Sequence, residues 1–283
     1  MLIENYIIIQ GEMMEMNRNR RIEIEKIADS VRDECGLVDY GFRDIFEAIE
    51  KAGYRVIRYP VGSNEFLGFS LIKDGEKIIF SNSSQILSRE IFTVAHEIGH
   101  HKLHLCEREN PIIKDDDFND RNENEIEANY FAACLLMPYE KMLKYIRLEL
   151  NKKDPDNYNG LDIARIQTNF NVSYEMVLVR LINLGLISKG KLNELKDEKM
   201  VFTATKLLEA ISGNSGLCRP TEAKKIPAEY LEWVTSNYRE KLIPKKTLEK
   251  ALSYMDLDSN DFQLQEDIEI EEEAFEDLLK GVD

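Results

Sequence analysis

The sequence predicts an α+β protein, because two stretches of helical periodicity precede a block of strands and only helical patterns follow it. Apolar side chains recur at helical spacing over residues 21–35 and 41–52. Runs rich in β-branched and aromatic residues then predict strands at 54–59, 66–72 and 77–81. We therefore expect a small antiparallel sheet that packs against helices and is followed by a mainly helical C-terminal region.

Turn and cap residues mark several of these boundaries. Gly53 directly follows the second helical segment, and glycine is a common residue after a helix because it adopts positive φ without strain. Asp74-Gly75 lies between the second and third strand segments and is a favoured turn pair of antiparallel hairpins. The sequence therefore predicts that segments 66–72 and 77–81 form a hairpin.

The helices after the sheet carry boundary signals of their own. A helix over residues 88–105 begins at a serine, which is a preferred N-cap. A second helix over 122–137 is followed by Pro138, which suits the first turn of the next helix. Residues 161–186 are interpreted as two helices joined by a tight turn at 171–173, whose last residue is a serine placed to cap the second helix.

Composition and charge limit the class of protein. The chain has 283 residues, of which 43% are apolar and 32% charged, as in ordinary globular proteins. Its formal net charge of −16 argues against nucleic acid or an anionic membrane as a partner, since both attract positive charge. The four cysteines are scattered without ligand spacing, and the apolar run at residues 6–9 is too short to span a bilayer. We therefore expect a cytoplasmic protein without direct contact to membrane or nucleic acid.

The succession of patterns predicts four regions. Residues 1–20 form an N-terminal extension, and residues 21–137 form the domain that carries the sheet and the histidines described below. Residues 138–190 form a helical subdomain that resembles a helix-turn-helix, and residues 191–283 form a helical C-terminal region. Its acidic run over residues 256–277 is most simply interpreted as a solvated face.

All four histidines of the chain fall within residues 96–104. His96 and His100 are four residues apart, so on an α-helix they share one face, with Cβ atoms roughly 5–6 Å apart. Two imidazoles placed in this way can hold one divalent ion. Glu97, beside the first histidine, can then take a proton from a water molecule that the ion activates. The spacing therefore predicts a site for metal-assisted hydrolysis, which the apolar neighbours can bury: Ile91, Val94, Ala95 and Ile98.

A catalytic site of this kind needs a third protein ligand and an open position for water. The extended pattern HExxHxxGxxH would supply one after a glycine bend. Here, however, Leu103 stands in place of the glycine and Cys106 in place of the histidine. We therefore favour a carboxylate from the following helix. Glu125 shares a helical face with three residues that allow close packing or further polar contact, namely Ala128, Asn129 and Ala132.

Other roles remain open for the polar residues of this helix. Glu125 can instead form a capping box with Asn122, and Glu127, which we expect to face solvent, is the second choice as ligand. Asn129 is placed to orient a metal-binding group one turn after Glu125. His104 is a further candidate for contacts around the metal, and it is one of two candidates to stabilise the oxyanion, together with Tyr130.

Two motifs resemble those of the ImmA/IrrE family of bacterial metallopeptidases. They are RxxFTVAHEIGHH at residues 89–101 and ExEANxFAACLLMP at residues 125–138. The resemblance extends more weakly over residues 21–190 and does not reach residues 191–283. It implies a metallopeptidase core with a gluzincin-like ligand set, in which the ion is held by two histidines and the later glutamate and Glu97 is the base; the ligands carried over are His96, His100 and Glu125.

Members of that family cleave a cognate helix-turn-helix repressor and thereby derepress mobile-element or stress genes. The resemblance therefore implies a metal-dependent endopeptidase whose protein partner is such a repressor. The cofactor would be one divalent ion, for which we expect zinc, although manganese and iron suit the same donors. Neither the oligomeric state nor the cleaved bond follows from the sequence.

A function of another class is a metal-binding, DNA-associated regulator without protease activity. In that case the helix-turn-helix-like segment 161–186 would read DNA. Its second helix carries Arg180 against Glu175, whereas DNA affinity depends on clustered lysine and arginine side chains. We therefore favour a helical subdomain that packs beside the active site or binds the protein substrate.

Overall fold

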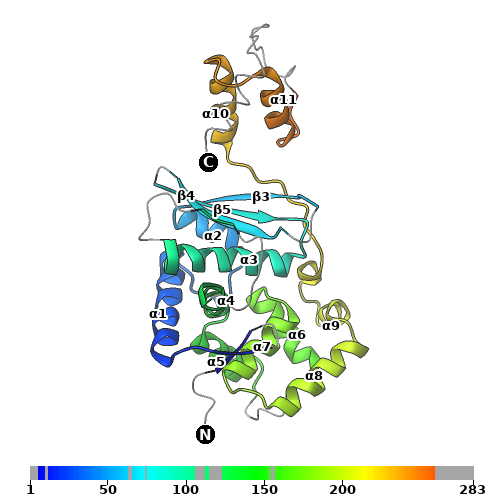
Figure 1. Ribbon diagram of the computed structural model, residues 1–283. Coiled ribbons are helices and arrows are strands. Elements are labelled where there is room, and N and C mark those ends of the chain that lie inside the picture. Colours follow the sequence, from blue (N-terminus) through cyan, green and yellow to red (C-terminus); the bar gives the residue numbers. More distant parts are fainter. Residues whose placement is uncertain are drawn as a thin grey trace. The chain divides into compact units, whose positions relative to one another are not determined.

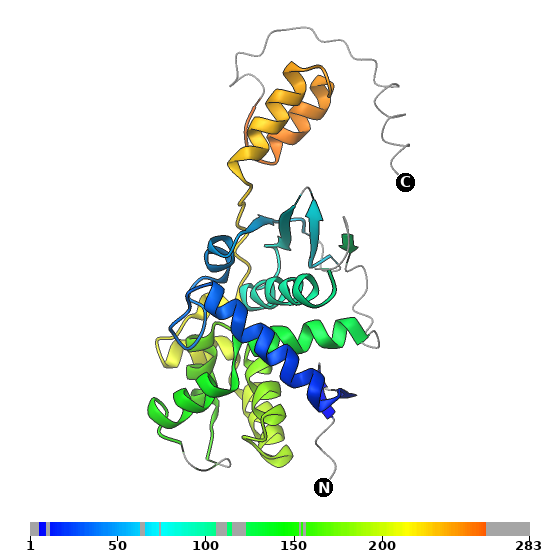
Figure 2. The ribbon, with the colours of Figure 1, turned by 90° about the vertical axis from the view of Figure 1, so that its left-hand side faces the viewer.

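The computed structural model describes residues 6–9, 12–62, 66–73, 75–105, 112–114, 123–152, 154 and 157–258. The chain divides into two compact units, residues 1–223 and 224–283. Both motifs belong to the first unit. Figure 1 labels most of its elements, and Figure 2 shows the ribbon turned by 90°.

The described strands form two sheets. A hairpin joins β1 and β2, and the larger sheet has the strand order β3-β5-β4-β6. The strands are β1 (Tyr6–Ile9), β2 (Glu12–Glu15), β3 (Tyr54–Tyr59), β4 (Gly68–Lys73), β5 (Glu76–Asn82) and β6 (Ile112–Lys114). The prediction of β3 is confirmed at both ends, and the sequence patterns missed β1, β2 and β6.

Helices make up most of the remaining described chain, which confirms the α+β class. They are α1 (Arg18–Glu34), α2 (Ile45–Lys51), α3 (Leu87–His100), α4 (Glu123–Leu136), α5 (Tyr139–Leu148), α6 (Gly160–Phe170), α7 (Tyr174–Asn183), α8 (Lys189–Val201), α9 (Ala204–Ala210), α10 (Ala228–Arg239) and α11 (Lys245–Ser253). In the described part of the chain, none of the helices has the length and apolar character needed to cross a membrane.

The larger sheet is mixed, which corrects the prediction of an antiparallel sheet. β4 and β5 form the expected antiparallel hairpin, with Lys73 opposite Glu76. β3, however, runs parallel to β5, with Tyr54 opposite Lys77. The connection after β3 skips the position next to it, and the returning strand of the hairpin fills that position. β4 runs opposite to β3, and β5 runs opposite to β4 because the two form a hairpin. β5 therefore runs in the same direction as β3.

The helix with the HExxH motif lies between the sheet and a second helix. α3 runs along one face of the larger sheet, and α4 packs on the opposite side of α3 (Figure 1). Gly99 allows this close approach, because a Cβ atom there would lie only 3.1 Å from Cα of Ala128. α1 packs against α4 in turn (Figure 2). The sheet, α3, α4 and α1 therefore fix the positions of the two motifs relative to each other.

Both ends of α3 differ from the prediction. Ile86, not Ser88, occupies the N-cap position, and it makes no side-chain capping bond. The backbone amide of Leu87 donates instead to the carbonyl of Arg219, at 2.9 Å, so a distant segment satisfies the start of this helix. At the other end the α-helix stops at His100 and continues as a π-helical turn over His101–Leu105. That turn changes where the last histidines point.

A short turn joins α6 and α7, at the residues where the sequence predicts it. Asn171 ends α6 in the left-handed conformation, with φ of 53°. Ser173 caps α7, since its Oγ accepts from the backbone N–H of Met176 at 3.1 Å. The amide side chain of Asn171 also donates to the carbonyl of Phe42 at 2.7 Å, which ties this turn to the segment before α2.

The second unit contains a pair of helices. α10 and α11 pack through a small apolar core of Val234, Tyr238, Leu248, Ala251 and Leu252. The acidic run predicted to be a solvated face lies almost entirely beyond residue 258, outside the described residues.

Candidate metal centre

His96 and His100 converge on the buried side of α3. Both residues are fully buried. Their ring centroids are 4.5 Å apart, and their Nε2 atoms are 2.9 Å apart. Val94, Ala95 and Ile98 on the same helix are fully buried in the core, as the motif predicted. The helical spacing and the packing of α3 together place both imidazoles at one point.

α4 brings the carboxylate of Glu125 to the same point. Oε2 of Glu125 lies 3.1 Å from Nε2 of His96, and Oε1 lies 3.0 Å from Nε2 of His100. One ligand atom from each of these three residues lies within 4.8 Å of the others. Asn122, the capping-box partner considered for Glu125, lies outside the described residues. The carboxylate therefore contacts both histidines, and the geometry favours the ligand interpretation.

The three side chains fit a divalent ion. Nitrogen and oxygen ligands about 2.0–2.1 Å from a tetrahedral zinc ion lie about 3.3–3.4 Å from one another. The separations here are 2.9, 3.0 and 3.1 Å, so small outward movements of the side chains accommodate the ion. Two imidazoles and one carboxylate are also a donor set that leaves a fourth position open for water or substrate.

The charge of Glu125 is held by its two partners. Burial alone raises the pKa of this carboxyl group, but the contacts with His100 and His96 lower it by more, to about 2. Glu125 is therefore ionised at neutral pH. An ionised carboxylate beside two buried imidazoles is suited to bind a cation.

Glu97 is buried next to this group and faces β4. A Cβ atom at Gly68 on β4 would lie 3.7 Å from Oε1 of Glu97, 2.6 Å from Cγ2 of Thr93 and 2.7 Å from the carbonyl oxygen of Phe80. Any larger residue at position 68 would therefore displace the neighbouring backbone or α3. Glycine lets β4 pass directly over the helix at the proposed base, a requirement that the sequence patterns did not reveal.

Asn129 contacts the far side of His96. Its Oδ1 lies 3.0 Å from Nδ1 of His96, and the amide is buried. If His96 binds an ion through Nε2, its proton lies on Nδ1 and is donated to Asn129. Asn129 thus lies where the sequence predicted a residue that orients a metal-binding group.

Glu127 is buried, which corrects the prediction that it faces solvent. Only 7% of its surface is exposed, because α1 covers it. Arg20 on α1 donates to both of its carboxylate oxygens, at 2.6 and 2.5 Å, and Nε2 of His104 lies 3.2 Å away. Arg20 precedes Glu127 by 107 residues, so no local pattern could indicate this pair. Glu127 is not part of the group that converges on Glu125.

A comparison with known protein families agrees with this geometry. Residues 49–182 match the family described as the IrrE N-terminal-like domain, Peptidase_M78. This part of the chain is similar to that domain. The match includes α3 and α4 with all the residues that converge here, and it supports a metallopeptidase-type function for the domain.

A curated relative comes from Bacillus phage phi105, where it is named "Uncharacterized immunity region protein 2". It is 32% identical over 98 residues, which cover 35% of this chain and 61% of the relative. The chain therefore spans about three fifths of the length of this relative.

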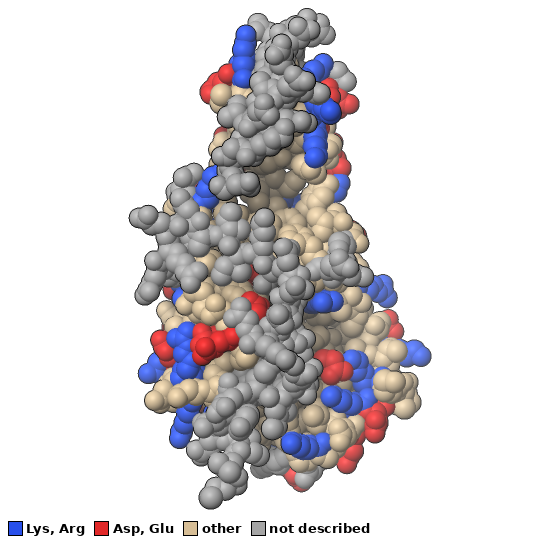
Figure 3. Space-filling model, viewed as in Figure 1, with Lys and Arg blue, Asp and Glu red and all other residues tan. Residues whose placement is uncertain are grey.

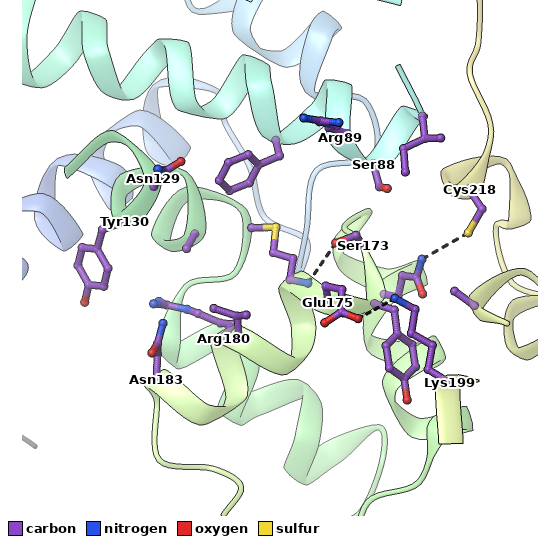
Figure 4. A pocket seen from close by; sticks show the side chains of 18 residues that line it. Ser88, Arg89, Asn129, Tyr130, Ser173, Glu175, Arg180, Asn183, Lys199 and Cys218 are labelled. Carbon is purple, nitrogen blue, oxygen red and sulfur yellow. Dashed lines mark hydrogen bonds and ion pairs between the residues drawn. The ribbon is translucent and has the colours of Figure 1, made fainter. Parts of the chain in front are cut away.

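A pocket of about 530 Å³ adjoins the candidate metal centre at Asn129 (Figure 4). Figure 4 shows Asn129 and Arg89 on one side of the pocket and Glu175 with Lys199 on the other. Nζ of Lys199 donates to Oε1 of Glu175 at 2.7 Å. Asn129 contacts His96, as described above. Apolar side chains supply much of the remaining lining, among them Ile86, Phe92, Ala133, Met176 and Val179.

The two candidates for oxyanion stabilisation are engaged elsewhere in this domain. The hydroxyl of Tyr130 donates to Oε1 of Glu25 on α1 at 2.5 Å, and burial raises the pKa of Tyr130. His104 contacts His100 and Glu127 through its two ring nitrogens. Neither group is directed at the space between the three converging side chains. Cys106, the disfavoured third ligand, lies outside the described residues.

Proposed function

We propose that this protein is a metal-dependent endopeptidase that cleaves a specific protein substrate. The observation that carries the proposal is the convergence of His96, His100 and Glu125 within 4.8 Å of one another, with Glu97 directly after the first histidine. A divalent ion bound there supplies Lewis-acid chemistry, because it lowers the pKa of water and polarises the carbonyl of the scissile bond. We propose zinc, while manganese and iron suit the same donors.

The protein's own groups perform the proton transfers in this proposal. Glu97 accepts a proton from the attacking water molecule while the oxygen of that water forms a bond to the carbonyl carbon. When the carbon–nitrogen bond breaks, Glu97 passes that proton to the leaving nitrogen. Asn129 holds the ring of His96, and Glu125 contributes a negative charge because its pKa is lowered to about 2. Glu97 therefore gains one proton and releases one proton in each turnover.

We propose further that the substrate is a helix-turn-helix repressor. The motif resemblance implies such a substrate, and we carry over to this chain the immunity-region setting that the name of the phage relative gives. The formal net charge of −16 supports the proposal, since a basic DNA-binding protein would be attracted to this chain by electrostatic steering.

The pocket beside Asn129 supports a substrate that is recognised by its side chains. Its apolar wall includes Phe92, whose ring centroid lies 6.3 Å from that of His96. An apolar side chain near the scissile bond can be buried there, and contacts remote from the reacting atoms help to position that bond. This recognition would favour one substrate over unfolded proteins in general.

The alternative of a DNA-associated regulator has less support. Arg180, the arginine of the helix that would read DNA, is only 1% exposed, and its Nε donates to the carbonyl of Met137 at 2.9 Å. It therefore helps to hold α7 against the end of α4. Lys and Arg side chains are interspersed with Asp and Glu among the described residues on the face shown in Figure 3. A salt titration of DNA binding separates the two functions, because phosphate contacts make the affinity for DNA fall steeply as the salt concentration rises.

The proposed function is tested by incubating the zinc-loaded protein with a helix-turn-helix repressor encoded in the same genomic region and, separately, with casein. We expect one cut in the repressor and little digestion of casein. The cut should slow as salt rises above about 0.1 M, where screening acts over about 10 Å. Chelation of the metal should abolish it. Digestion of casein without a cut in the repressor would replace the proposal with a general peptidase.

A further inference from the structure

A row of polar side chains contacts His100 on the ring nitrogen that does not face Glu125. Nδ1 of His100 lies 3.1 Å from Nδ1 of His104. Nε2 of His104 lies 3.2 Å from Oε2 of Glu127. Arg20 on α1 ends the row, since it donates to both carboxylate oxygens of Glu127. The row therefore links α1 and α4 to a proposed metal ligand.

One arrangement of protons satisfies every contact in this row. If His100 binds an ion through Nε2, its proton lies on Nδ1 and is donated to His104. Nδ1 of His104 must then be unprotonated, so the proton of that ring lies on Nε2 and is donated to Glu127. The ionised carboxylate of Glu127 accepts from His104 and from Arg20 at the same time. The position of the proton on His100 therefore determines its position on His104.

The backbone after α3 brings His104 into this row. Residues His101–Leu105 form a π-helical turn, and such turns are rare and frequently occur at functional sites. The ring centroids of His100 and His104 are 5.2 Å apart. In the ion pair of Arg20 with Glu127 the side chains are 30% and 9% exposed, and an ion pair is by itself weak evidence for a role in stability. The pair contacts His104 through Glu127, which suggests a role in holding that ring.

We infer that Glu127 is a positioning residue of the metal centre: through His104 it fixes the tautomer and the ring orientation of His100, and Arg20 holds Glu127 in place. The inference rests on the proposed function, because it requires a metal ion at His96, His100 and Glu125. It assigns a role to a carboxylate that lies two residues from the proposed ligand on α4 and contacts none of the three converging side chains.

The test measures the affinity of the purified protein for zinc by competition with a chromophoric chelator. We expect Glu127→Ala and His104→Ala each to weaken zinc binding by about 10–100-fold. The double variant should lose little more than the weaker-binding single variant, because both changes interrupt the same row. Glu127→Gln should recover most of the affinity, since its amide oxygen still accepts from His104.

A matched control is the ion pair of Glu34 with Lys102, whose atoms are 2.9 and 3.0 Å apart. It also connects α1 to the π-helical turn, but it is absent from the row that reaches His100. Glu34→Gln should therefore bind zinc as the wild type does. The thermal unfolding midpoints of the metal-free proteins show whether each variant is folded.

The outcomes separate this inference from the proposed function. Glu127→Ala that binds zinc like the wild type, or Glu34→Gln that weakens binding equally, would overturn the positioning role. A wild-type protein that binds neither zinc nor manganese nor iron would overturn the proposed function and this role with it. If Glu127→Ala fails to fold, ¹⁵N NMR of the zinc-loaded wild type decides. The role requires the proton on Nδ1 of His100 and on Nε2 of His104, and the opposite tautomer of His104 would contradict it.

Discussion

Nδ1 of His96 lies 3.0 Å from Oδ1 of Asn129, which follows Glu125 by one turn of α4. The helix that supplies the carboxylate therefore also holds the ring that faces it. This relationship depends on the close packing of α3 and α4 at Gly99. α3 and α4 therefore act together in placing the side chains of the candidate metal centre.

The first prediction concerns Asn129. Asn129→Ala should weaken zinc binding by about 10–100-fold, because the ring of His96 loses the acceptor that orients it. Asn129→Asp, which keeps an acceptor at the same distance, should lose much less. Asn183→Ala, in the same pocket wall but on α7, serves as the control and should leave affinity unchanged. Equal affinities for Asn129→Ala and the wild type would remove Asn129 from the site.

The second prediction ranks the carboxylates of α4. Glu125→Ala should lose zinc far beyond the 10–100-fold expected for Glu127→Ala, because one of three protein ligands is removed. Cys106→Ala should keep the metal. Metal content after dialysis, measured by elemental analysis, checks the ranking. Loss of metal from Glu127→Ala and retention by Glu125→Ala would show that the ligand on this helix has been assigned to the wrong residue.

The third prediction concerns the close approach of the two helices. Gly99→Val should lower the free energy of unfolding by about 1–3 kcal/mol, because its side chain must displace Ala128 and Phe131. Gly190→Val on α8 is the control, since a Cβ atom there would meet only Ser188 Oγ at 3.8 Å. Urea unfolding of the metal-free proteins measures both. A Gly99 variant as stable as the control would contradict the packing described for α3 and α4.

The fourth prediction concerns a buried ion pair under the sheet. Arg58 donates to both oxygens of Glu90, at 2.8 and 2.7 Å, and Glu90 has a side-chain exposure of 0%. Arg58→Met should therefore cost about 3–5 kcal/mol of stability at neutral pH, because it leaves a buried charge without its partner. Arg43→Met breaks an exposed pair with Asp39, at 88% and 53% exposure, and should cost less than about 1 kcal/mol.

Local chemistry explains which parts of the fold the sequence predicts. β3 has its predicted bounds because a glycine precedes it and its apolar residues form one continuous strand pattern. The turn between α6 and α7 follows from an asparagine that tolerates positive φ and a serine that caps the next helix. That His96 and His100 share one face follows from helical spacing.

Contacts between distant segments explain what the sequence patterns missed. The parallel pairing of β3 with β5 depends on the path of a connection, which no residue pattern encodes. The start of α3 depends on a carbonyl of Arg219, and the burial of Glu127 depends on Arg20, more than a hundred residues away in each case. Glu125 could be favoured from the sequence because it lies on the face of small residues, but its distance from His96 required the structure.

The most direct test of the central claim is the pairing of metal content with cleavage in Glu97→Gln. The variant keeps the shape of the side chain and all three proposed ligands, so zinc content should equal that of the wild type. Cleavage of the helix-turn-helix repressor should fall by at least about 10²–10⁴-fold, the usual loss when a general base is removed. A Glu97→Gln protein that binds zinc and cuts the repressor at the wild-type rate would contradict the account.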